Sequence, residues 1–392
     1  MKDTQIQNLI KAEAKRQKSV INLIASENYV SKDVLQALGS ELTNKYAEGY
    51  PGARYYGGNT IIDKIENLAK ARALKTFGLS AGKWDVNVQA LSGSPANLAV
   101  YTALLPTNGK GKIMGMNLSD GGHLTHGHKV SASGKLFKQI PFGVDKKTEV
   151  LDYDALKKLA QTKKPDIIVA GFTAYPREID WKKFREIADS CGAILMADIS
   201  HLAGLIAGKA YPSPFQYADV VTTTTHKTLR GPRSALIFSK KDERNFPAKI
   251  NKAVFPGLQG GPHLNQIGAV AVALNEAQSV DFKKYAKQVI KNARALADEL
   301  TKQGFRIVSG GTDSHLVLVD TFMDGEGISG GQASDKLEKA GIIVNKNTIP
   351  NDKRSPMDPS GIRLGTAAET TRGKTEKDFV KIGKKIAEVL TK

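Results

Sequence analysis

The junction between a strand-like segment and a His-Lys pair, at residues 220–227, combines residue types that can do covalent chemistry. Val220 to Thr225 are six consecutive β-branched residues, which predict a buried strand. His226 and Lys227 follow directly. Ligands of open α/β sheets bind at strand ends, and a partly desolvated lysine with a lowered pKa there suits Schiff-base chemistry. The alternative is a solvated lysine in a lysine-rich chain. The Schiff-base hypothesis therefore requires that other segments of the chain bind a carbonyl cofactor next to this lysine.

A Ser-Gly-Ser turn is the candidate for binding the phosphate of such a cofactor. Ser92, Gly93 and Ser94 lie between a predicted strand at 86–89 and a predicted helix that runs to Leu105. In this arrangement backbone N–H groups and hydroxyls face an anion, and the helix dipole favours its charge. The tripeptide by itself does not identify a phosphate site.

An aspartate, a histidine and an arginine complete the set. Asp198 follows an apolar strand at 193–196, which places it at the same sheet edge, and its alternative role is a helix cap. His123 suits stacking on a planar ring, and a metal site in the His-x-x-His-x-His pattern of residues 123–128 is the alternative. Arg363 lies between apolar residues.

These side chains together suit pyridoxal phosphate. The lysine would bond to the aldehyde, and the aspartate would keep the pyridine nitrogen protonated so that the ring can act as an electron sink. The arginine would hold a substrate carboxylate through two hydrogen bonds. The residues therefore predict an enzyme that acts on amino acids.

A glycine-rich loop at residues 44–58 concentrates aromatic side chains. Four of the eleven tyrosines fall in it, together with Glu48 and Arg54. A loop with this composition favours a role in ligand binding over a purely structural one.

The elements that position these residues alternate between strands and helices, which predicts a mostly parallel sheet covered on both faces. We expect an N-terminal arm at 1–25, a large cofactor-binding domain at 26–279 and a smaller α+β domain at 280–392. A single long helix is predicted from about residue 266 to 301, and a polar loop at 345–360.

Composition limits the class of protein. The 392 residues are 41% hydrophobic and 24% charged, with one cysteine, Cys191, so we expect a globular cytoplasmic protein without an intrachain disulfide. No segment approaches the roughly 18 apolar residues of a membrane span, and residues 1–18 lack the apolar core of a signal peptide. The net charge of +18 suggests nucleic-acid binding as an alternative. Because the lysines are spread along the chain, a basic surface that attracts anionic ligands is favoured.

The chain resembles serine hydroxymethyltransferase nearly from end to end. The most specific match is the run of four threonines followed by His226, Lys227, Thr228 and Leu229. Other matching stretches are 23–28, 44–58, 92–94, 121–127, 198–204, 259–261 and 360–366. The resemblance implies the aspartate aminotransferase architecture of fold-type-I pyridoxal phosphate enzymes. It also implies reversible conversion of L-serine and tetrahydrofolate to glycine and 5,10-methylenetetrahydrofolate. A folate-independent aldolase of the threonine aldolase type is the alternative enzyme.

The resemblance also implies roles for individual residues. Lys227 would hold the cofactor as an internal aldimine, His226 would tune reaction specificity, and Glu48 and Tyr56 would act in catalysis, with Glu48 as acid or base. Further cofactor contacts would be Ser92, Gly93, Ser94, His123, Thr173, Asp198, His201, Tyr46, Gly260 and Gly261. Substrate contacts would be Ser26, Tyr56 and Arg363 for the amino acid, and Leu118, Gly122, His123, Leu124, Asn347, Ser355, Pro356 and Met357 for the folate. Because Tyr46, Glu48, Tyr56, Gly260 and Gly261 reach the neighbouring subunit in that family, a homodimer or tetramer with shared sites is expected, with no metal.

Overall fold

The structure is a computed structural model that describes residues 1–391, so the expected C-terminal limit at residue 392 lies outside it. A seven-stranded sheet forms its centre, in the order β4-β10-β9-β8-β7-β5-β6. The links among β9, β8, β7, β5 and β6 are parallel, whereas β10 pairs antiparallel with β9 and β4. The predicted α/β architecture with a mostly parallel sheet is therefore confirmed. The strands are β4 (Trp84–Asn87), β5 (Lys112–Met116), β6 (Lys138–Phe142), β7 (Ile167–Ala170), β8 (Ile194–Asp198), β9 (Val220–Thr224) and β10 (Ala235–Lys240).

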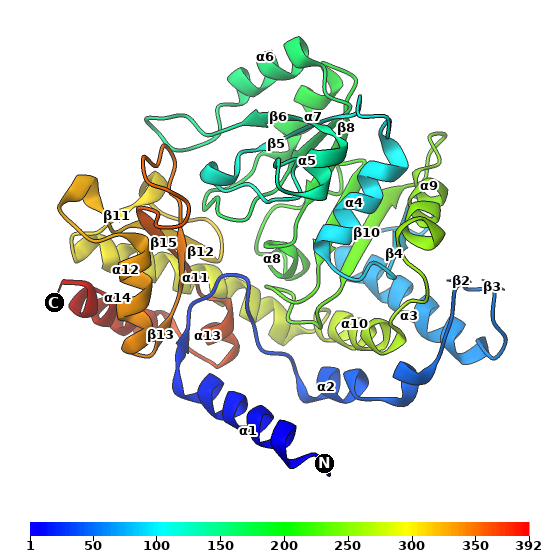
Figure 1. Ribbon diagram of the computed structural model, residues 1–392, viewed down its shortest axis with the longest axis horizontal. Coiled ribbons are helices and arrows are strands. Elements are labelled where there is room, and N and C mark those ends of the chain that lie inside the picture. The colour runs from blue at the N-terminus through cyan, green and yellow to red at the C-terminus, as the bar shows by residue number, and fades with distance from the viewer. Residues whose placement is uncertain (392) are drawn as a thin grey trace.

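Apolar side chains of the central strands enter two separate cores, one on each face of the sheet. In β7, Ile168 and Ala170 belong to one core, while Ile167 and Val169 belong to the other. Side chains alternate across a strand, so a strand that is apolar at every position must be covered on both faces. Helices surround this sheet in Figure 1. They are α3 (Thr60–Phe77), α4 (Gly93–Leu104), α5 (Ala132–Leu136), α6 (Tyr153–Lys163), α7 (Trp181–Asp189), α8 (Ala203–Ala207), α9 (Phe246–Lys252) and α10 (Leu264–Glu276).

A four-stranded antiparallel sheet, in the order β11-β12-β15-β14, organises the C-terminal part of the chain. Its core contains Leu337 and Phe379 from two helices, together with Leu23 from the N-terminal segment. Figure 1 shows these elements to the left of the large sheet. They are β11 (Arg306–Ile307), β12 (Leu316–Asp320), α12 (Gly330–Lys339), β13 (Ile342–Ile343), β14 (Asn345–Asn347), β15 (Gly361–Gly365), α13 (Ala367–Thr371) and α14 (Glu376–Thr391).

The prediction of one long helix between the two parts is wrong. The chain forms α10 and then α11 (Val280–Lys302), because Ser279 caps the second helix through a bond from Phe282 N to its Oγ at 3.1 Å. The first half of α11 packs into the large core, including Tyr285, and its second half packs into the C-terminal core. The three-domain division stays a prediction. The loop expected at 345–360 begins instead with a strand, β14.

The N-terminal segment crosses from one part of the chain to the other. Helix α1 (Thr4–Ser19), capped by Asp3, has no buried residue and extends away from the rest of the chain in Figure 1. The two-residue strand β1 (Ile21–Asn22) then pairs in parallel with β13. The chain continues through α2 (Lys32–Leu38) and the hairpin of β2 (Gly49–Tyr50) and β3 (Ala53–Arg54). None of the helices in residues 1–391 is long and apolar enough to cross a membrane.

Candidate functional site

A cavity of about 350 Å³ lies beyond the carboxyl ends of β7, β8 and β9. This is the edge at which ligands bind in open α/β sheets. Eleven of the residues predicted from the sequence line it: Ser26, Ser92, Gly93, Ser94, His123, Thr173, Asp198, His201, His226, Lys227 and Arg363. The cavity therefore unites side chains that lie more than 330 residues apart in the chain, since 363 − 26 = 337.

Lys227 lies in the turn that follows β9. Burial lowers the pKa of its amine to about 8, with Asp198 opposing the shift and Arg363 and Arg233 adding to it. At this pKa a substantial fraction of the amine is neutral near physiological pH, which is the form that attacks a carbonyl carbon. Its neighbour His226 also lines the cavity, and burial lowers the pKa of that ring to about 3.

Asp198 ends strand β8 and is a buried carboxylate in the cavity wall. Its Oδ2 accepts hydrogen bonds from Asn97 Nδ2 at 2.9 Å and pairs with His126 Nε2 at 3.2 Å, and its Oδ1 accepts from Ser200 N at 3.1 Å. Burial alone would raise the pKa of Asp198, but these bonds, chiefly that of His126, hold it well below its usual range. The carboxylate is thus kept ionised in the cavity lining, and it caps no helix, since the N-cap of the next helix, α8, is Leu202.

Two histidines of the predicted set, His123 and His201, are neutral rings in the cavity wall. Burial lowers the pKa of His123 to about 4, and its Nδ1 lies 2.7 Å from Thr125 Oγ1. Burial also lowers the pKa of His201, whose Nδ1 lies 3.1 Å from His315 Nε2 while its Nε2 is buried without a partner in the described chain. The second histidine of the 123–128 motif, which was the alternative metal site, is His126, and its ring pairs with Asp198. Within residues 1–391 no group of three His, Cys, Asp or Glu side chains is arranged to hold a metal ion.

The N-terminus of α4 closes one end of the cavity. Ser92 is its N-cap and Gly93 and Ser94 are its first residues. A Cβ on Gly93 would lie 2.7 Å from Thr224 Cγ2, so glycine alone lets the helix approach β9 this closely. The first N–H groups of a helix have no intrahelical partner and attract anions.

Arg363, in strand β15, brings a buried guanidinium to the same cavity from the C-terminal sheet. Only 6% of the residue is exposed, and burial lowers its pKa to about 10, so it remains protonated at neutral pH. Its Nη1 donates to Thr173 O at 2.8 Å and its Nε to Asn345 Oδ1 at 3.1 Å. These bonds fix the plane of the guanidinium relative to the end of β7.

Five predicted site residues gather elsewhere, in a group that we call the tyrosine cluster: Tyr46, Glu48, Tyr56, Gly260 and Gly261. The Tyr46 and Tyr56 rings meet edge to face at 4.9 Å, and Tyr46 OH donates to Glu48 Oε1 at 3.0 Å. Tyr46 and Tyr56 are 50% and 48% exposed, and no member of the cluster lines the cavity of its own chain.

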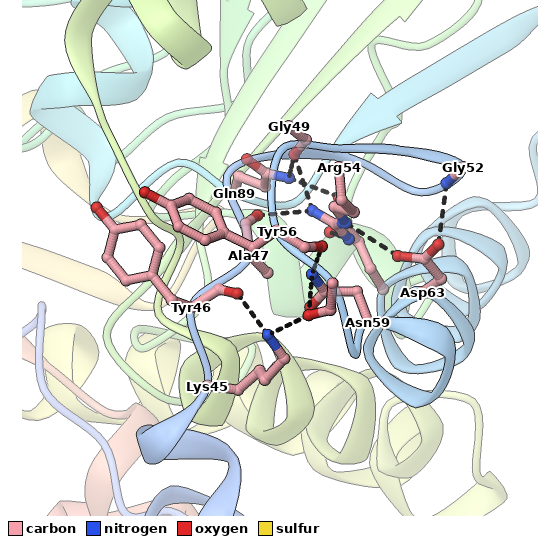
Figure 2. Close-up of polar contacts among 12 residues, drawn as sticks. Lys45, Tyr46, Ala47, Gly49, Gly52, Arg54, Tyr56, Asn59, Asp63 and Gln89 are labelled. Atoms are coloured by element: carbon pink, nitrogen blue, oxygen red, sulfur yellow. Dashed lines mark hydrogen bonds and ion pairs between the residues drawn. The ribbon is translucent and has the colours of Figure 1, made fainter.

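A buried arginine holds the loop that carries this cluster, as Figure 2 shows. Arg54 Nη1 donates to the carbonyls of Ala47 and Gly49, on either side of Glu48, at 2.9 and 2.8 Å. Its other nitrogens pair with Asp63 at 2.9 Å and Glu66 at 2.6 Å. Because both carboxylates come from α3, the loop is fixed to a rigid element.

Apart from His123, which lines the cavity, the residues predicted for folate lie on two adjoining segments outside the cavity lining. Leu118, Gly122 and Leu124 belong to or follow the short 3-10 turn Leu118–Asp120, and Asn347, Ser355, Pro356 and Met357 lie in and after β14. A bond from Thr348 Oγ1 to Ser119 O at 3.1 Å joins the two segments. Leu118, Leu124 and Met357 are exposed to solvent.

Comparison with known proteins decides the family. A family model described as "Serine hydroxymethyltransferase" matches residues 1–386. The chain belongs to the serine hydroxymethyltransferase family. A "Serine hydroxymethyltransferase" of Legionella pneumophila (strain Lens) is 56% identical over 381 residues, covering 97% of this chain and 89% of the relative. One from Koribacter versatilis is 54% identical over 388 residues, covering 99% and 88%. A "Probable serine hydroxymethyltransferase, cytosolic" of Schizosaccharomyces pombe is 50% identical over 405 residues, covering 99% and 86%.

Membership in the serine hydroxymethyltransferase family confirms the predicted function and makes the chain an enzyme of the transferase class. It gives no support to the folate-independent aldolase alternative or to the RNA-binding alternative. Sequence reasoning missed several residues that line the cavity, among them Asn97, His126 and Arg233. His126 was part of a recognised histidine motif, but nothing local indicated that its partner was Asp198. The roles of the individual site residues stay predictions.

Proposed function

We propose that this member of the serine hydroxymethyltransferase family transfers the hydroxymethyl carbon of L-serine to tetrahydrofolate at the cavity, reversibly, with pyridoxal phosphate as cofactor. The observation that carries the proposal is the convergence of Lys227, Asp198 and the N-terminus of α4 on one cavity of about 350 Å³. An amine, a carboxylate and an anion site are the three partners that an aldehyde, a pyridine nitrogen and a phosphate require.

The residues present fit this cofactor. Lys227 would hold it covalently, Ser92 to Ser94 would bind its phosphate, and Asp198 would accept the hydrogen bond of its ring nitrogen. His123 would stack on its ring, and the unpartnered Nε2 of His201 would face its oxygen substituent, near Thr173. When bound, pyridoxal phosphate supplies an electron sink for the bond that breaks at the α-carbon of the amino acid.

The substrate would be held and deprotonated by side chains of two subunits. Arg363, with Ser26 beside it, would bind the amino-acid carboxylate through charge-assisted hydrogen bonds. Glu48 would move the proton at the hydroxymethyl oxygen, with Tyr56 next to it, while His226 lies directly beside the lysine. Folate would lie against Leu118, Gly122, His123 and Leu124, and against Asn347, Ser355, Pro356 and Met357.

A dimer with shared sites accounts for the separation of the tyrosine cluster from the cavity. Its two tyrosines are half exposed, and the three large apolar side chains of α1, Ile6, Leu9 and Ile10, are exposed as well. A second copy of the chain would cover these surfaces and bring Glu48 to the partner's cavity, whether the assembly is a dimer or a tetramer. Composition favours a cytoplasmic location, as in the S. pombe relative named cytosolic.

The deciding experiment is Lys227→Ala, compared with Lys240→Ala, which removes a half-buried lysine outside the cavity. Wild type and Lys240→Ala should gain visible absorbance with pyridoxal phosphate, and this absorbance should change when glycine and then tetrahydrofolate are added. After borohydride reduction, both proteins should carry a reduced cofactor adduct on the peptide that contains Lys227. Lys227→Ala should show neither the adduct nor turnover. Wild-type turnover in that variant would refute the assignment, and glycine α-proton exchange that ignores tetrahydrofolate would favour the aldolase alternative.

A further inference from the structure

The side-chain amide of Asn28 lies where three distant segments of the chain meet at the Lys227 turn. Its Nδ2 donates to the backbone carbonyl of Lys227 at 2.9 Å and to Tyr285 OH at 2.8 Å. Its Oδ1 accepts from Tyr29 N at 2.9 Å and from Thr371 Oγ1 at 2.7 Å. One amide thus connects the N-terminal segment, α11 and α13 to the residue that carries the reactive amine.

The orientation of this amide is determined by its partners. The Tyr29 N–H can only donate and the Lys227 carbonyl can only accept, so Oδ1 and Nδ2 cannot exchange places. The amide has two N–H donors and an oxygen with two lone pairs, so it can make four hydrogen bonds. All four are present. A fully satisfied polar group of this kind is costly to alter, because any change leaves a partner unpaired.

The turn itself depends on contacts from outside its own sequence. Within the turn, the Lys227 carbonyl accepts a second bond from Arg230 N at 3.1 Å. From outside the turn, Tyr285 OH in α11 donates to Thr228 O at 3.1 Å. Arg230 has a positive φ of 59°, and its guanidinium lies 4.4 Å from the centre of the Tyr285 ring. Tyr285 therefore supports the turn twice, and Asn28 connects Tyr285 to the lysine carbonyl.

We infer that Asn28 is a positioning residue for Lys227, held in place by Tyr285 and Thr371. The inference rests on the proposed function, in which the Lys227 amine bonds to the cofactor. Asn28 touches the backbone of Lys227, so it acts by fixing the turn from which the amine projects.

The test is Asn28→Asp, which keeps the shape of the side chain and replaces the Nδ2 donor with an acceptor facing the Lys227 carbonyl. The matched control is Asn292→Asp. Asn292 is a buried amide in α11 whose Nδ2 also donates twice, to Thr370 Oγ1 at 2.8 Å and Lys374 O at 2.9 Å, away from the turn. Two measurements are made on both full-length variants: kcat of the cofactor-loaded enzyme, and the pH at which Lys227 of cofactor-free protein becomes half reactive toward acetic anhydride, followed by peptide mass spectrometry.

Asn28→Asp should raise the labelling midpoint from about 8 toward that of an ordinary lysine, because a displaced and less desolvated amine regains its proton more easily. It should lower kcat about tenfold, as expected for one buried hydrogen bond turned repulsive. Asn292→Asp should keep the wild-type midpoint and kcat. If Asn28→Asp gives the same labelling midpoint and the same kcat as Asn292→Asp, the inference is overturned.

If Asn28→Asp fails to fold, Tyr285→Phe decides. It removes only the hydroxyl between Asn28 and Thr228 and should raise the midpoint by a smaller amount; an unchanged midpoint would overturn the inference. Failure of the proposed function looks different, because the wild-type enzyme would then form no cofactor adduct at Lys227.

Discussion

Arg363 offers the sharpest test of how the cavity selects its substrate. Two of its guanidinium nitrogens are occupied by Thr173 O and Asn345 Oδ1, at 2.8 and 3.1 Å. Its Nη2 forms no hydrogen bond to the described part of the chain, and the residue lines the cavity. The protein thus orients a charged donor group and leaves hydrogen-bonding capacity for a ligand carboxylate.

Arg363→Ala should weaken serine binding severely. Removing one partner of a buried, hydrogen-bonded charge pair costs about 2–5 kcal/mol, which corresponds to roughly 30- to 4,000-fold in Kd at 1.4 kcal/mol per factor of ten. Because Arg363 is only 6% exposed, little solvent screening reduces this figure. Arg363→Lys should bind serine with an affinity between those of wild type and Arg363→Ala, since lysine keeps the charge and lacks the planar set of donors of a guanidinium.

The assay is spectroscopic titration of the cofactor-loaded enzyme with serine and with serinamide, whose neutral amide replaces the carboxylate. Wild type should prefer serine strongly, and Arg363→Ala should bind both ligands weakly and about equally. Arg177→Ala, which removes an arginine outside the cavity, should behave as wild type. An Arg363→Ala variant that still prefers serine over serinamide would refute the reasoning, because the carboxylate would then be recognised elsewhere.

Two further predictions concern Lys227 and the tyrosine cluster. Because burial lowers the pKa of Lys227 to about 8, cofactor loading should accelerate as pH rises through 8 and then level off, well below the range of an exposed lysine; a rate that still climbs at pH 10 would contradict this pKa. Mixing Lys227→Ala with Glu48→Gln subunits should restore about a quarter of wild-type turnover, since half of the dimers are mixed and each has one intact site. If the mixture stays as inactive as its components, Glu48 does not serve the partner's cavity.

The order and type of the elements near the site could largely be predicted from the sequence. Strand β7 occupies the predicted residues 167–170, and Lys227 follows a strand as expected. These predictions depend on local properties, namely β-branched runs, apolar periodicity and turn residues. The break between α10 and α11 was missed, because apolar periodicity continues across Ser279 and only its side-chain cap reveals the boundary.

Partnerships within the cavity could not be predicted in the same way. Asp198 looked like either a ligand residue or a cap, and its bonds to His126 and Asn97 span 72 and 101 residues. Nothing in the pattern around Asn28 pointed to Lys227, 199 residues away. Such pairs form because separate segments pack side by side, and packing depends on the whole core.

The kinds of chemical group this protein carries could be recognised in short segments of its chain: an amine after a buried strand, a Ser-Gly-Ser turn before a helix, and an arginine among apolar residues. Local propensity and side-chain chemistry are properties of short segments, so they can be read without the fold. Which of these groups meet depends on how the folded chain packs. The tertiary structure brought Arg363 and Lys227 to one cavity, lowered the pKa of His123 by burial, and left the tyrosine cluster outside the cavity lining. Distance, burial and electrostatic shifts depend on contacts between remote segments, which no local pattern contains.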